Sequence, residues 1–348
     1  MSSTKRYLGI LFAGLILTSC MTTQSVPIDQ MEPGKVLLPS TIRKVALIAR
    51  NFKFSVDTLG GYLNVDFRLK KVTKADNLLI DSVAITKSLE SIRKELLESG
   101  RFDEVFVYPY KAIKPHSGDK DLPLTPSFIQ SVCAESETNA VISLEMLSFF
   151  YSRHNGSATG EINPEANVKV TAIWSVYLPK DNDQVDRYTH SEVVRWNNNP
   201  TNNPKFELPG RKEAVAYACA VAAKNYSKRI VPYWTEASRD LISLDQPDFE
   251  KAISLALKNR WKDAALIWEK YTKSSQNRIA GVAALNYAVA MEMLGDTGKA
   301  TFWSAQSLKL LKNGEKGKIA RAYAATLYQR KLKAERLDSL LNVNHPQL

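Results

Sequence analysis

The chain is poor in the residues that most often bind metals. It contains only four histidines among 348 residues, at His116, His154, His190 and His345. They lie far apart, and none has a cysteine, an aspartate or a second histidine at a ligand spacing such as H-E-x-x-H. We therefore predict no metal site among them.

Catalytic and phosphate-binding motifs are also missing. The glycine-rich segment 154–160 (HNGSATG) contains neither G-x-S-x-G nor a Gly-Lys-Ser/Thr sequence that opens a helix. It is most simply a connection between two strands. We predict that the protein is not an enzyme and that it has no catalytic or cofactor-binding residues. Two carboxylates brought together only by the fold would leave a hydrolase as an alternative.

One acidic pattern imitates part of a calcium loop. Asp181, Asp183 and Glu192 stand at its positions 1, 3 and 12. Val185 occupies a ligand position, however, and Asp186 stands where the sharp turn requires glycine. We therefore predict no calcium site in this segment.

Cysteine is scarce as well, with three in the chain. Cys133 and Cys219 both fall in predicted helices. They either form one disulfide or remain two buried thiols, because free cysteine behaves as a small apolar residue. Sequence alone cannot show whether their Cα atoms lie close enough to pair.

The apolar run near the start of the chain is short. It extends from Leu8 to Leu17 and follows Lys5 and Arg6. A membrane-spanning helix needs roughly 20 apolar residues, so this run is typical of a cleaved secretory signal peptide over residues 1–19.

The residues that end this run, Leu17-Thr18-Ser19-Cys20, resemble the lipobox of bacterial lipoproteins. The resemblance implies that the Cys20 sulfur is acylated, for example with palmitate, and becomes the first residue of a membrane-anchored chain. No acidic cluster follows Cys20, which favours the periplasmic side of the outer membrane. The alternative is an ordinary secretory leader that happens to contain a cysteine.

Composition predicts a folded protein of two domains. Hydrophobic residues make up 44% of the chain and charged residues 24%, which is ordinary for globular proteins. Residues 20–40 contain three prolines and a glycine, so we predict a flexible lipidated tether there. We expect an α/β domain over residues 41–244 and a helical domain over residues 245–348.

The formal net charge is +11, and most of the excess lies in the last hundred residues. Clustered lysine and arginine suit a phosphate backbone, but a lipid anchor outside the cytoplasm argues against nucleic acid. An anionic lipid head group, an acidic glycan or an acidic protein is the better partner. A solvated basic surface without a fixed ligand is the alternative.

Periodicity within the first domain predicts alternating strands and helices. Asp81 is placed to cap the first helix, and Gly100 to end it. The strand with the clearest alternation is 168–178, and we expect 185–196 to return as its antiparallel partner. The expected strands are 43–50, 104–108, 140–149, 168–178 and 185–196; the expected helices are 82–99, 126–137 and 213–241.

Three segments carry a family resemblance: Lys44–Ile48, Leu97–Phe102 before a valine-rich strand, and Asn139–Ser143. In them the chain resembles the small α/β domain of curli-secretion lipoproteins and of lipoprotein activators of cell-wall synthases. The resemblance covers about residues 40–240. It implies a sandwich-like domain with a mixed or antiparallel sheet.

The region after Pro247 shows a repeated pattern of small residues. Ala252, Ala264 and Trp268 recur as Ala288, Ala300 and Ser304, about 36 residues later, with Gly295 at a turn. This is similar to the tetratricopeptide repeat, and a third unit is expected near Ala324. Simple helical hairpins packed as a bundle are the alternative. We expect the three tryptophans of this region, Trp261, Trp268 and Trp303, to pack in its core.

In general plan the chain resembles lipoproteins of Bacteroidetes-type bacteria that have C-terminal repeats and no assigned activity. We predict a lipid-anchored cell-envelope protein that acts as a non-enzymatic binding or scaffolding component, with a protein partner held by its helical repeats. Two other functions stay open: a subunit of an envelope secretion assembly, and an envelope hydrolase.

Overall fold

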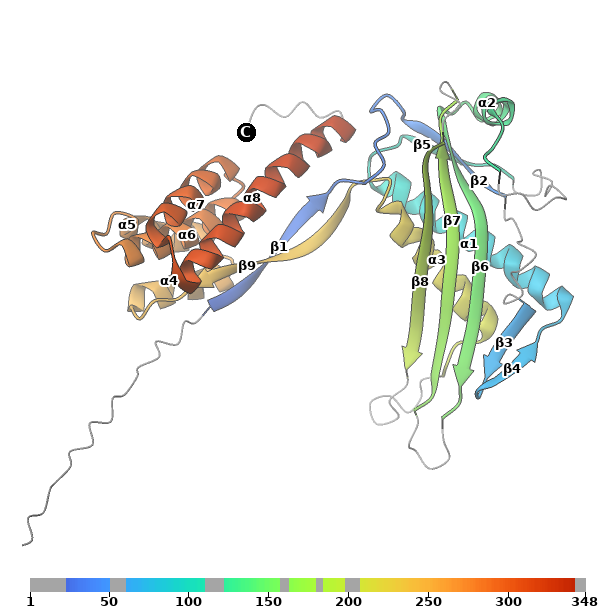
Figure 1. The fold of residues 1–348 in the computed structure, drawn as a ribbon, viewed down its shortest axis with the longest axis horizontal. Helices are drawn as coiled ribbons and strands as arrows, with labels where there is room; N and C mark the ends of the chain where they lie inside the picture. Colours follow the sequence, from blue (N-terminus) through green and yellow to red (C-terminus); the bar gives the residue numbers. More distant parts are fainter. Residues whose placement is uncertain are drawn as a thin grey trace, which may run out of the picture. The chain divides into compact units, whose positions relative to one another are not determined.

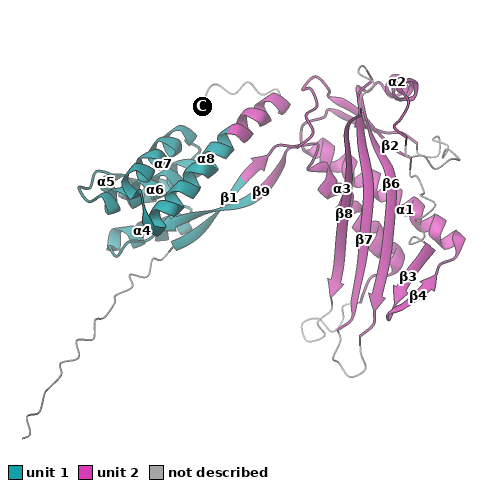
Figure 2. Ribbon diagram, in the orientation of Figure 1, with its two compact units in different colours: residues 1–29, 236–331, 347–348 teal, residues 30–235, 332–346 magenta. Residues whose placement is uncertain are grey.

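The computed structural model describes residues 23–50, 61–109, 122–156, 163–179, 184–197 and 207–341. Its described part divides into two compact units (Figure 2). The α/β unit contains residues 30–235 and 332–341, and the helical unit contains residues 23–29 and 236–331. The predicted fold class, an α/β domain with a mixed sheet followed by an all-helical domain, is confirmed. Within the described residues, the helices are too short or too polar to cross a bilayer.

A seven-stranded mixed sheet forms the centre of the α/β unit (Figure 1). Its longest strand, β6 (Ala140–His154), pairs along one edge with two strands in parallel and along the other with one antiparallel strand. Both ends of the sheet are open edges, formed by β5 or β4 on one side and by β8 on the other. The other strands are β2 (Lys44–Ala49), β3 (Tyr62–Val65), β4 (Arg68–Lys71), β5 (Glu104–Val107), β7 (Glu165–Tyr177) and β8 (Gln184–Asn197).

The strand alternation predicted for 168–178 is confirmed by β7. Every second side chain, from Val168 to Val176, is buried on one face of the sheet. β8 returns antiparallel to β7, as expected. The pattern was readable because an antiparallel strand with one covered face alternates apolar and polar residues at period two.

Helices cover both faces of the sheet. α1 (Lys74–Glu98) and α3 (Arg211–Ser227) pack over one face, and α2 (Pro126–Glu135) packs over part of the other. The predicted apolar stripe of α1, which includes Leu89 and Ile92, is buried. Gly100 has φ +69°, the conformation in which glycine ends a helix, as predicted.

The start of α1 was predicted incorrectly. The helix begins at Lys74, and its N-cap is Thr73, whose Oγ1 accepts a hydrogen bond from the Asp76 N–H at 3.2 Å. Asp81, the predicted cap, lies buried inside the helix. The Thr-x-x-Asp pattern just before the apolar stripe is the better start signal.

The predicted flexible tether is also wrong where the structure describes it. Residues 23–32 form β1 (Thr23–Glu32), and Val36 and Leu38 are buried in the α/β unit. Arg101, itself 1% exposed, donates hydrogen bonds to the carbonyls of Leu38, Pro39 and Ile42 at 2.7–3.1 Å. Hydrogen bonds from a charged donor contribute about 1.5–3 kcal/mol, enough to hold a proline-containing segment in place.

The long helix predicted over 213–241 ends early. α3 stops at Ser227, and residues 233–242 form β9 (Tyr233–Ile242), which pairs with β1 in a two-stranded sheet. Pro232 explains the break, because proline has no N–H for a helical hydrogen bond and clashes with the preceding turn.

Among the described residues, the helical unit contains four helices and the larger part of a fifth, α8. Nearly every side chain of the central helix α6 from Ala280 to Glu292 is buried, and Gly295 turns the chain at φ +84°, as predicted. The three tryptophans pack in or against this core. Ala324 lies within one continuous 28-residue helix, so no further helix pair begins there among the described residues. The helices are α4 (Pro247–Leu257), α5 (Trp261–Tyr271), α6 (Asn277–Met293), α7 (Thr297–Leu311) and α8 (Gly314–Leu341).

A buried charged cluster fastens β9 and α8 to α6. The Glu292 carboxylate accepts hydrogen bonds from Arg239 at 2.9 Å on each oxygen, from the Tyr323 hydroxyl at 3.0 Å, and from Arg330. Burial alone would raise the pKa of Glu292, but the bonds from the two arginines outweigh it and hold that pKa below 4.5. The carboxylate is therefore ionised and fully partnered.

Candidate functional site

The edge strand β8 carries polar residues on the face where β7 is apolar. Asp186, Tyr188, His190 and Glu192 lie opposite buried β7 residues in the antiparallel register. Directly opposed residues share one face of a sheet, so these four side chains face the layer that contains α3. Polar groups on the inner face of an edge strand can protect the edge, or they can build a site.

The end of α3 lies over this polar face. Tyr226 is 1% exposed and stacks on Trp174 with ring centroids 5.0 Å apart. Arg229, just beyond the helix, pairs with both oxygens of Asp186 at 2.9 and 2.6 Å, and its guanidinium lies 4.2 Å from the Tyr188 ring centroid. The hydrogen bonds raise the pKa of Arg229, which keeps it charged.

The segment that leads from β1 to β2 fixes the last part of the site. The N–H groups of Lys35 and Val36 donate to the Arg229 carbonyl at 2.6 and 2.9 Å. Gly34 makes this approach possible, since a Cβ there would lie 2.7 Å from the Ile230 carbonyl group. A region far away in sequence is thereby held against the end of α3.

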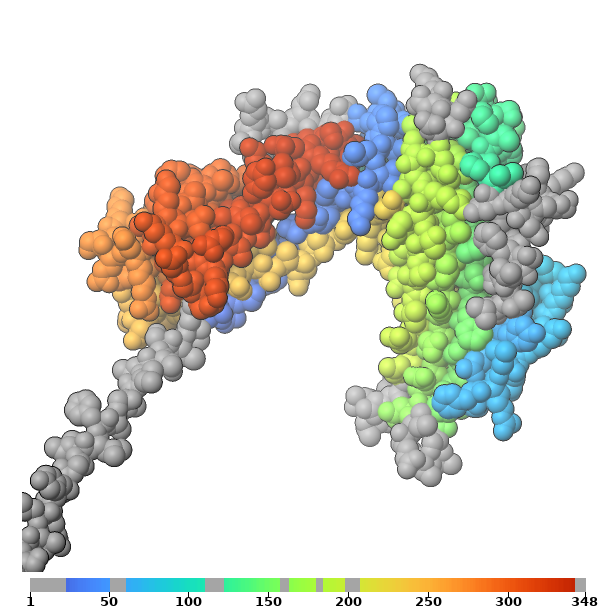
Figure 3. Space-filling model, viewed as in Figure 1, coloured from blue at the N-terminus to red at the C-terminus, as the bar shows by residue number. Residues whose placement is uncertain are grey.

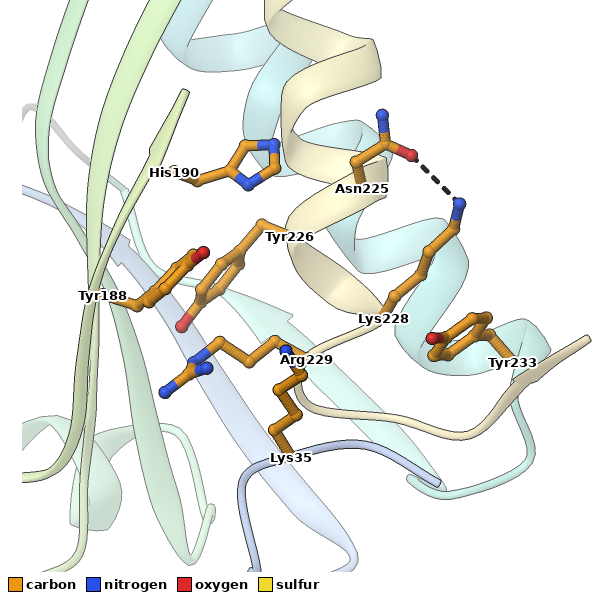
Figure 4. Close-up of a pocket in the computed structure, with 8 residues that line it drawn as sticks. All are labelled: Lys35, Tyr188, His190, Asn225, Tyr226, Lys228, Arg229 and Tyr233. Carbon is orange, nitrogen blue, oxygen red and sulfur yellow. Dashed lines mark hydrogen bonds between the residues drawn. The ribbon is translucent and has the colours of Figure 1, made fainter. Parts of the chain in front are cut away.

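These elements enclose a pocket of about 230 Å³, which we call the β8–α3 pocket (Figure 4). Most of its lining comes from β8 and from the end of α3. The lining residues are Lys35, Tyr188, His190, Asn225, Tyr226, Lys228, Arg229 and Tyr233.

The pocket lining is positively charged. It includes Lys35, Lys228 and Arg229 and contains no carboxylate. Lys228 Nζ donates to the neutral amide of Asn225 at 3.1 Å, so its charge is not cancelled there. Glu192, outside the lining, accepts a 2.7 Å hydrogen bond from that amide. The arrangement favours an anionic group inside the pocket.

The Tyr226 hydroxyl and His190 Nε2 are buried polar groups of the lining, and neither has a hydrogen-bond partner among the described residues; the hydroxyl is the clear donor of the two. Burial raises the pKa of Tyr226 well above 10, and the nearby charge of Asp186 adds a smaller increase. The hydroxyl therefore keeps its proton. Figure 4 shows it directed toward Tyr188 and Arg229. An unpaired buried hydroxyl costs about 1–3 kcal/mol, which a ligand oxygen that accepts a hydrogen bond from it would recover.

Several residues of the sequence-based hypotheses lie outside the described residues. They are Cys20, the predicted lipidation site, together with His116, Asp181, Asp183 and His345. The lipid anchor therefore stays a prediction. Glu192, the third member of the imitated calcium loop, lies 3.5 Å from His190 Nε2 and is also bound by Asn225. In the described part of the chain, three metal-binding side chains do not come together anywhere.

The two buried cysteines and His154 do not line the pocket. Cys133 and Cys219 are both free and buried, in separate clusters on opposite faces of the sheet, so the disulfide alternative is wrong. His154 Nδ1 lies 3.1 Å from Asp66 Oδ1, far from His190 in the sheet register. The two histidines do not form a common site.

Part of the basic surface of α8 is paired internally. Arg330 binds Glu292, Lys333 Nζ binds Glu32 at 2.6 Å, and Arg336 donates to a backbone carbonyl at 2.8 Å. These contacts leave fewer cations for the predicted anionic partner of the C-terminal region.

A second polar cluster lies in the middle of the sheet. Glu145 is fully buried at a β-bulge, where the register shifts between Leu144 and Met146. Its carboxylate accepts hydrogen bonds from Tyr177 at 2.7 Å and Arg50 at 2.9 Å. Burial outweighs these contacts and raises the pKa of Glu145, and burial also raises the pKa of Tyr177 to about 12. The Glu145 carboxylate has hydrogen-bond partners within the sheet unit, so we assign it a structural role.

The sequence contains one signal for the β8–α3 pocket. Asp186, Tyr188, His190 and Glu192 alternate along the strand predicted to pair with 168–178. The chain therefore had a polar stripe beside an apolar one. The contributions of Lys35 and Arg229 had no local signal, because tertiary contacts bring them together.

The fold and the pocket define a protein with an α/β sheet unit that carries a cationic pocket, and with a separate helical unit. The chain belongs to the family described as "Domain of unknown function (DUF8603)", whose model matches residues 42–241. A second family model, "Domain of unknown function (DUF6340)", matches residues 250–334.

Comparisons with individual proteins do not identify a relative of known function. No curated protein matches the chain. Among solved structures, the PelC dodecamer from Paraburkholderia phytofirmans is 11% identical, covers 59% of this chain and 98% of its own, and has a TM-score of 0.24. A single-substitution variant of that PelC dodecamer is also 11% identical, covers 59% of this chain and 100% of its own, and has a TM-score of 0.23. Scores this low do not establish a common fold.

Proposed function

We propose that the protein is a lipid-anchored component of the bacterial cell envelope that works by binding, and that its β8–α3 pocket holds an anionic group of the ligand. One observation carries the proposal: two lysines, together with Arg229 in its pair with Asp186, line the pocket beside a buried, unpaired hydroxyl donor, and no carboxylate lines it. A phosphate or carboxylate accepts hydrogen bonds from all of these donors.

The size of the pocket supports a small ligand group. Sites for drug-sized ligands occupy about 300–1,000 Å³, and this pocket is smaller, at about 230 Å³. Tyr188 and Tyr233 offer flat aromatic surfaces next to the cations. A single acidic sugar or a phosphate-containing head group matches this combination.

The lining favours binding over catalysis. It contains no serine, threonine or cysteine that could act as a nucleophile, and no pair of carboxylates. Its most buried hydroxyl, on Tyr226, has a raised pKa, which makes it a hydrogen-bond donor instead of a base.

Acylation of Cys20 would complete the proposed function. A lipid tether raises the local concentration of the protein near a partner on the same surface. A modest intrinsic affinity for that partner is then sufficient. The helical unit contributes the scaffolding surface, where large apolar side chains such as Leu266, Phe302 and Tyr328 remain exposed.

Thermal unfolding of the full chain with Cys20→Ala tests the pocket. Glucuronate and inorganic phosphate should raise the melting temperature, and uncharged glucose should not. At 100 times the dissociation constant, a ligand stabilises the folded state by about 2.7 kcal/mol. Lys228→Gln should reduce the shift, whereas Lys318→Gln, in an exposed pair on α8, should leave it unchanged. Equal shifts with glucose and glucuronate would contradict an anion site.

Mass spectrometry of the native protein tests the anchor separately. We expect a mature chain that starts at Cys20 and carries fatty acyl groups. A chain that retains residues 1–19, or an unmodified Cys20, would remove the envelope anchor from the proposal and leave the pocket unaffected.

A further inference from the structure

The tip of the β3–β4 hairpin has an unusual backbone. Its two-residue turn consists of Asp66 at φ +49° and Phe67 at φ +62°. Turns of this kind normally contain asparagine or glycine, because both central residues need positive φ. A bulky side chain in this region is strained, so the surrounding structure must hold Phe67 in place.

The end of β6 provides that support. Asp66 accepts hydrogen bonds from the Asn155 N–H at 2.8 Å and the Asn155 side chain at 2.9 Å, and its N–H donates to the Arg153 carbonyl at 3.0 Å. The ring of Phe67 lies 4.4 Å from that of His154, tilted by 49°. The tip is therefore a rigid feature.

This rigid tip presents an apolar and cationic surface. Phe67 is 75% exposed, and Leu69 is 63% exposed. Arg68, Lys70 and Lys71 are also exposed, and none forms an ion pair with another described residue. In Figure 3 the hairpin and the start of α1, in light blue, form one projecting area of the α/β unit.

Protection of the sheet edge explains only part of this pattern. Lysines on an edge strand discourage pairing with another chain. A large aromatic residue held outward at positive φ has no such role, and it would favour association through apolar contact. Cations around exposed apolar side chains are typical of segments that lie in the head-group region of a bilayer.

We propose that this hairpin tip docks on the surface of an anionic lipid bilayer. Phe67 and Leu69 enter the head-group region, and Arg68, Lys70 and Lys71 contact lipid phosphates. At about 3.4 Å per residue, the three cations lie within about 10 Å of one another along β4, comparable to the depth of the interface. The contact is separate from the β8–α3 pocket and does not depend on an occupied pocket.

Vesicle co-sedimentation tests this contact with the mature chain, residues 20–348 carrying Cys20→Ala, so that neither the leader nor an acyl chain contributes. The vesicles contain about three parts phosphatidylcholine to one part phosphatidylglycerol, and pure phosphatidylcholine serves as the uncharged comparison. We expect binding to the anionic vesicles that weakens at high salt. The double variant Lys70→Gln/Lys71→Gln should bind about thirtyfold more weakly.

Phe67→Asn separates the membrane contact from folding. Asparagine tolerates positive φ, so the melting temperature should stay the same or rise, whereas vesicle binding should fall about fivefold to tenfold. Phe302→Ser, which removes an exposed phenylalanine from the helical unit, is the matched control and should bind as the parent does.

Three results would overturn the hairpin proposal. The first is equal binding, or none, with charged and uncharged vesicles. The second is unchanged binding by Phe67→Asn. The third is loss of vesicle binding in Tyr226→Phe, or on addition of inorganic phosphate at constant ionic strength, which would assign the lipid contact to the β8–α3 pocket. Failure of the pocket to bind glucuronate would leave the hairpin proposal intact.

Discussion

One buried polar group in each unit shows a different arrangement. In the helical unit, the Glu292 carboxylate accepts hydrogen bonds from two arginines and a tyrosine. In the α/β unit, the Tyr226 hydroxyl is equally buried but has no partner among the described residues. A fully satisfied network fixes a structure, whereas an unsatisfied donor beside a cavity is a place where a ligand can add a bond.

Removal of the Glu292 carboxylate should have the largest effect on stability. Glu292→Ala leaves Arg239 buried without its partner, and loss of one member of a buried ion pair costs about 3–5 kcal/mol. Urea unfolding followed by circular dichroism measures the change. Glu315→Ala, which removes an exposed pair with Lys318, should lose at most about 0.5 kcal/mol. Similar losses for the two variants would contradict a structural role for the buried cluster.

The same substitution in each unit tests the comparison directly. Tyr323→Phe deletes a hydrogen bond to a buried carboxylate and should lower the free energy of unfolding by about 1.5–3 kcal/mol. Tyr226→Phe deletes an unpaired hydroxyl and should leave that free energy unchanged or slightly raised. A large loss from Tyr226→Phe would mean that this hydroxyl has a structural partner.

Asp186→Asn should separate stability from binding. The substitution breaks the pair with Arg229 and should lower stability by about 1–2 kcal/mol. It also leaves the charge of Arg229 uncancelled at the pocket, so glucuronate should bind about threefold to tenfold more tightly. Asp263→Asn, in an exposed pair with Arg260, should change neither quantity appreciably. Weaker anion binding by Asp186→Asn would contradict the electrostatic account.

The smallest expected effect is a pH dependence from the helical unit. The folded-state pKa of Glu292 lies below 4.5, so this group stabilises the fold above its ordinary pKa. That contribution should decline as the pH falls from about 4.5 through the folded-state pKa. In Glu292→Gln the decline over this range should be shallower, as measured by urea unfolding at stepped pH. Parallel curves for the two proteins would assign the acid sensitivity to other groups.

The sequence predicted the regular elements because their signals are local. The alternation of β7, the apolar stripe of α1 and the turn at Gly295 all follow from spacing along a few residues. The wrong predictions concern two local signals, the cap at Thr73 and the break at Pro232, and places where tertiary contacts decide the structure. Residues 23–40 look like a spacer in composition, yet Arg101 fixes their last part.

The candidate site was harder to predict than the fold. Lys35 and Arg229 meet only because the backbone N–H of one binds the carbonyl of the other across nearly 200 residues. The unpaired hydroxyl of Tyr226 could not be predicted from the sequence either, because a tyrosine in an alanine-rich helix indicates core packing. The polar stripe of β8 was the one readable sign, and it gives no indication of a cavity.

Isothermal titration of the full chain with glucuronate is the most direct test of the anion pocket. The parent protein should release or absorb heat that saturates at one ligand per chain, and glucose should give none. Tyr226→Phe should weaken that binding about tenfold, with its unfolding free energy unchanged, because the hydroxyl is a donor only to the ligand. Identical titrations for the parent and Tyr226→Phe, or equal affinity for glucose and glucuronate, would contradict the account.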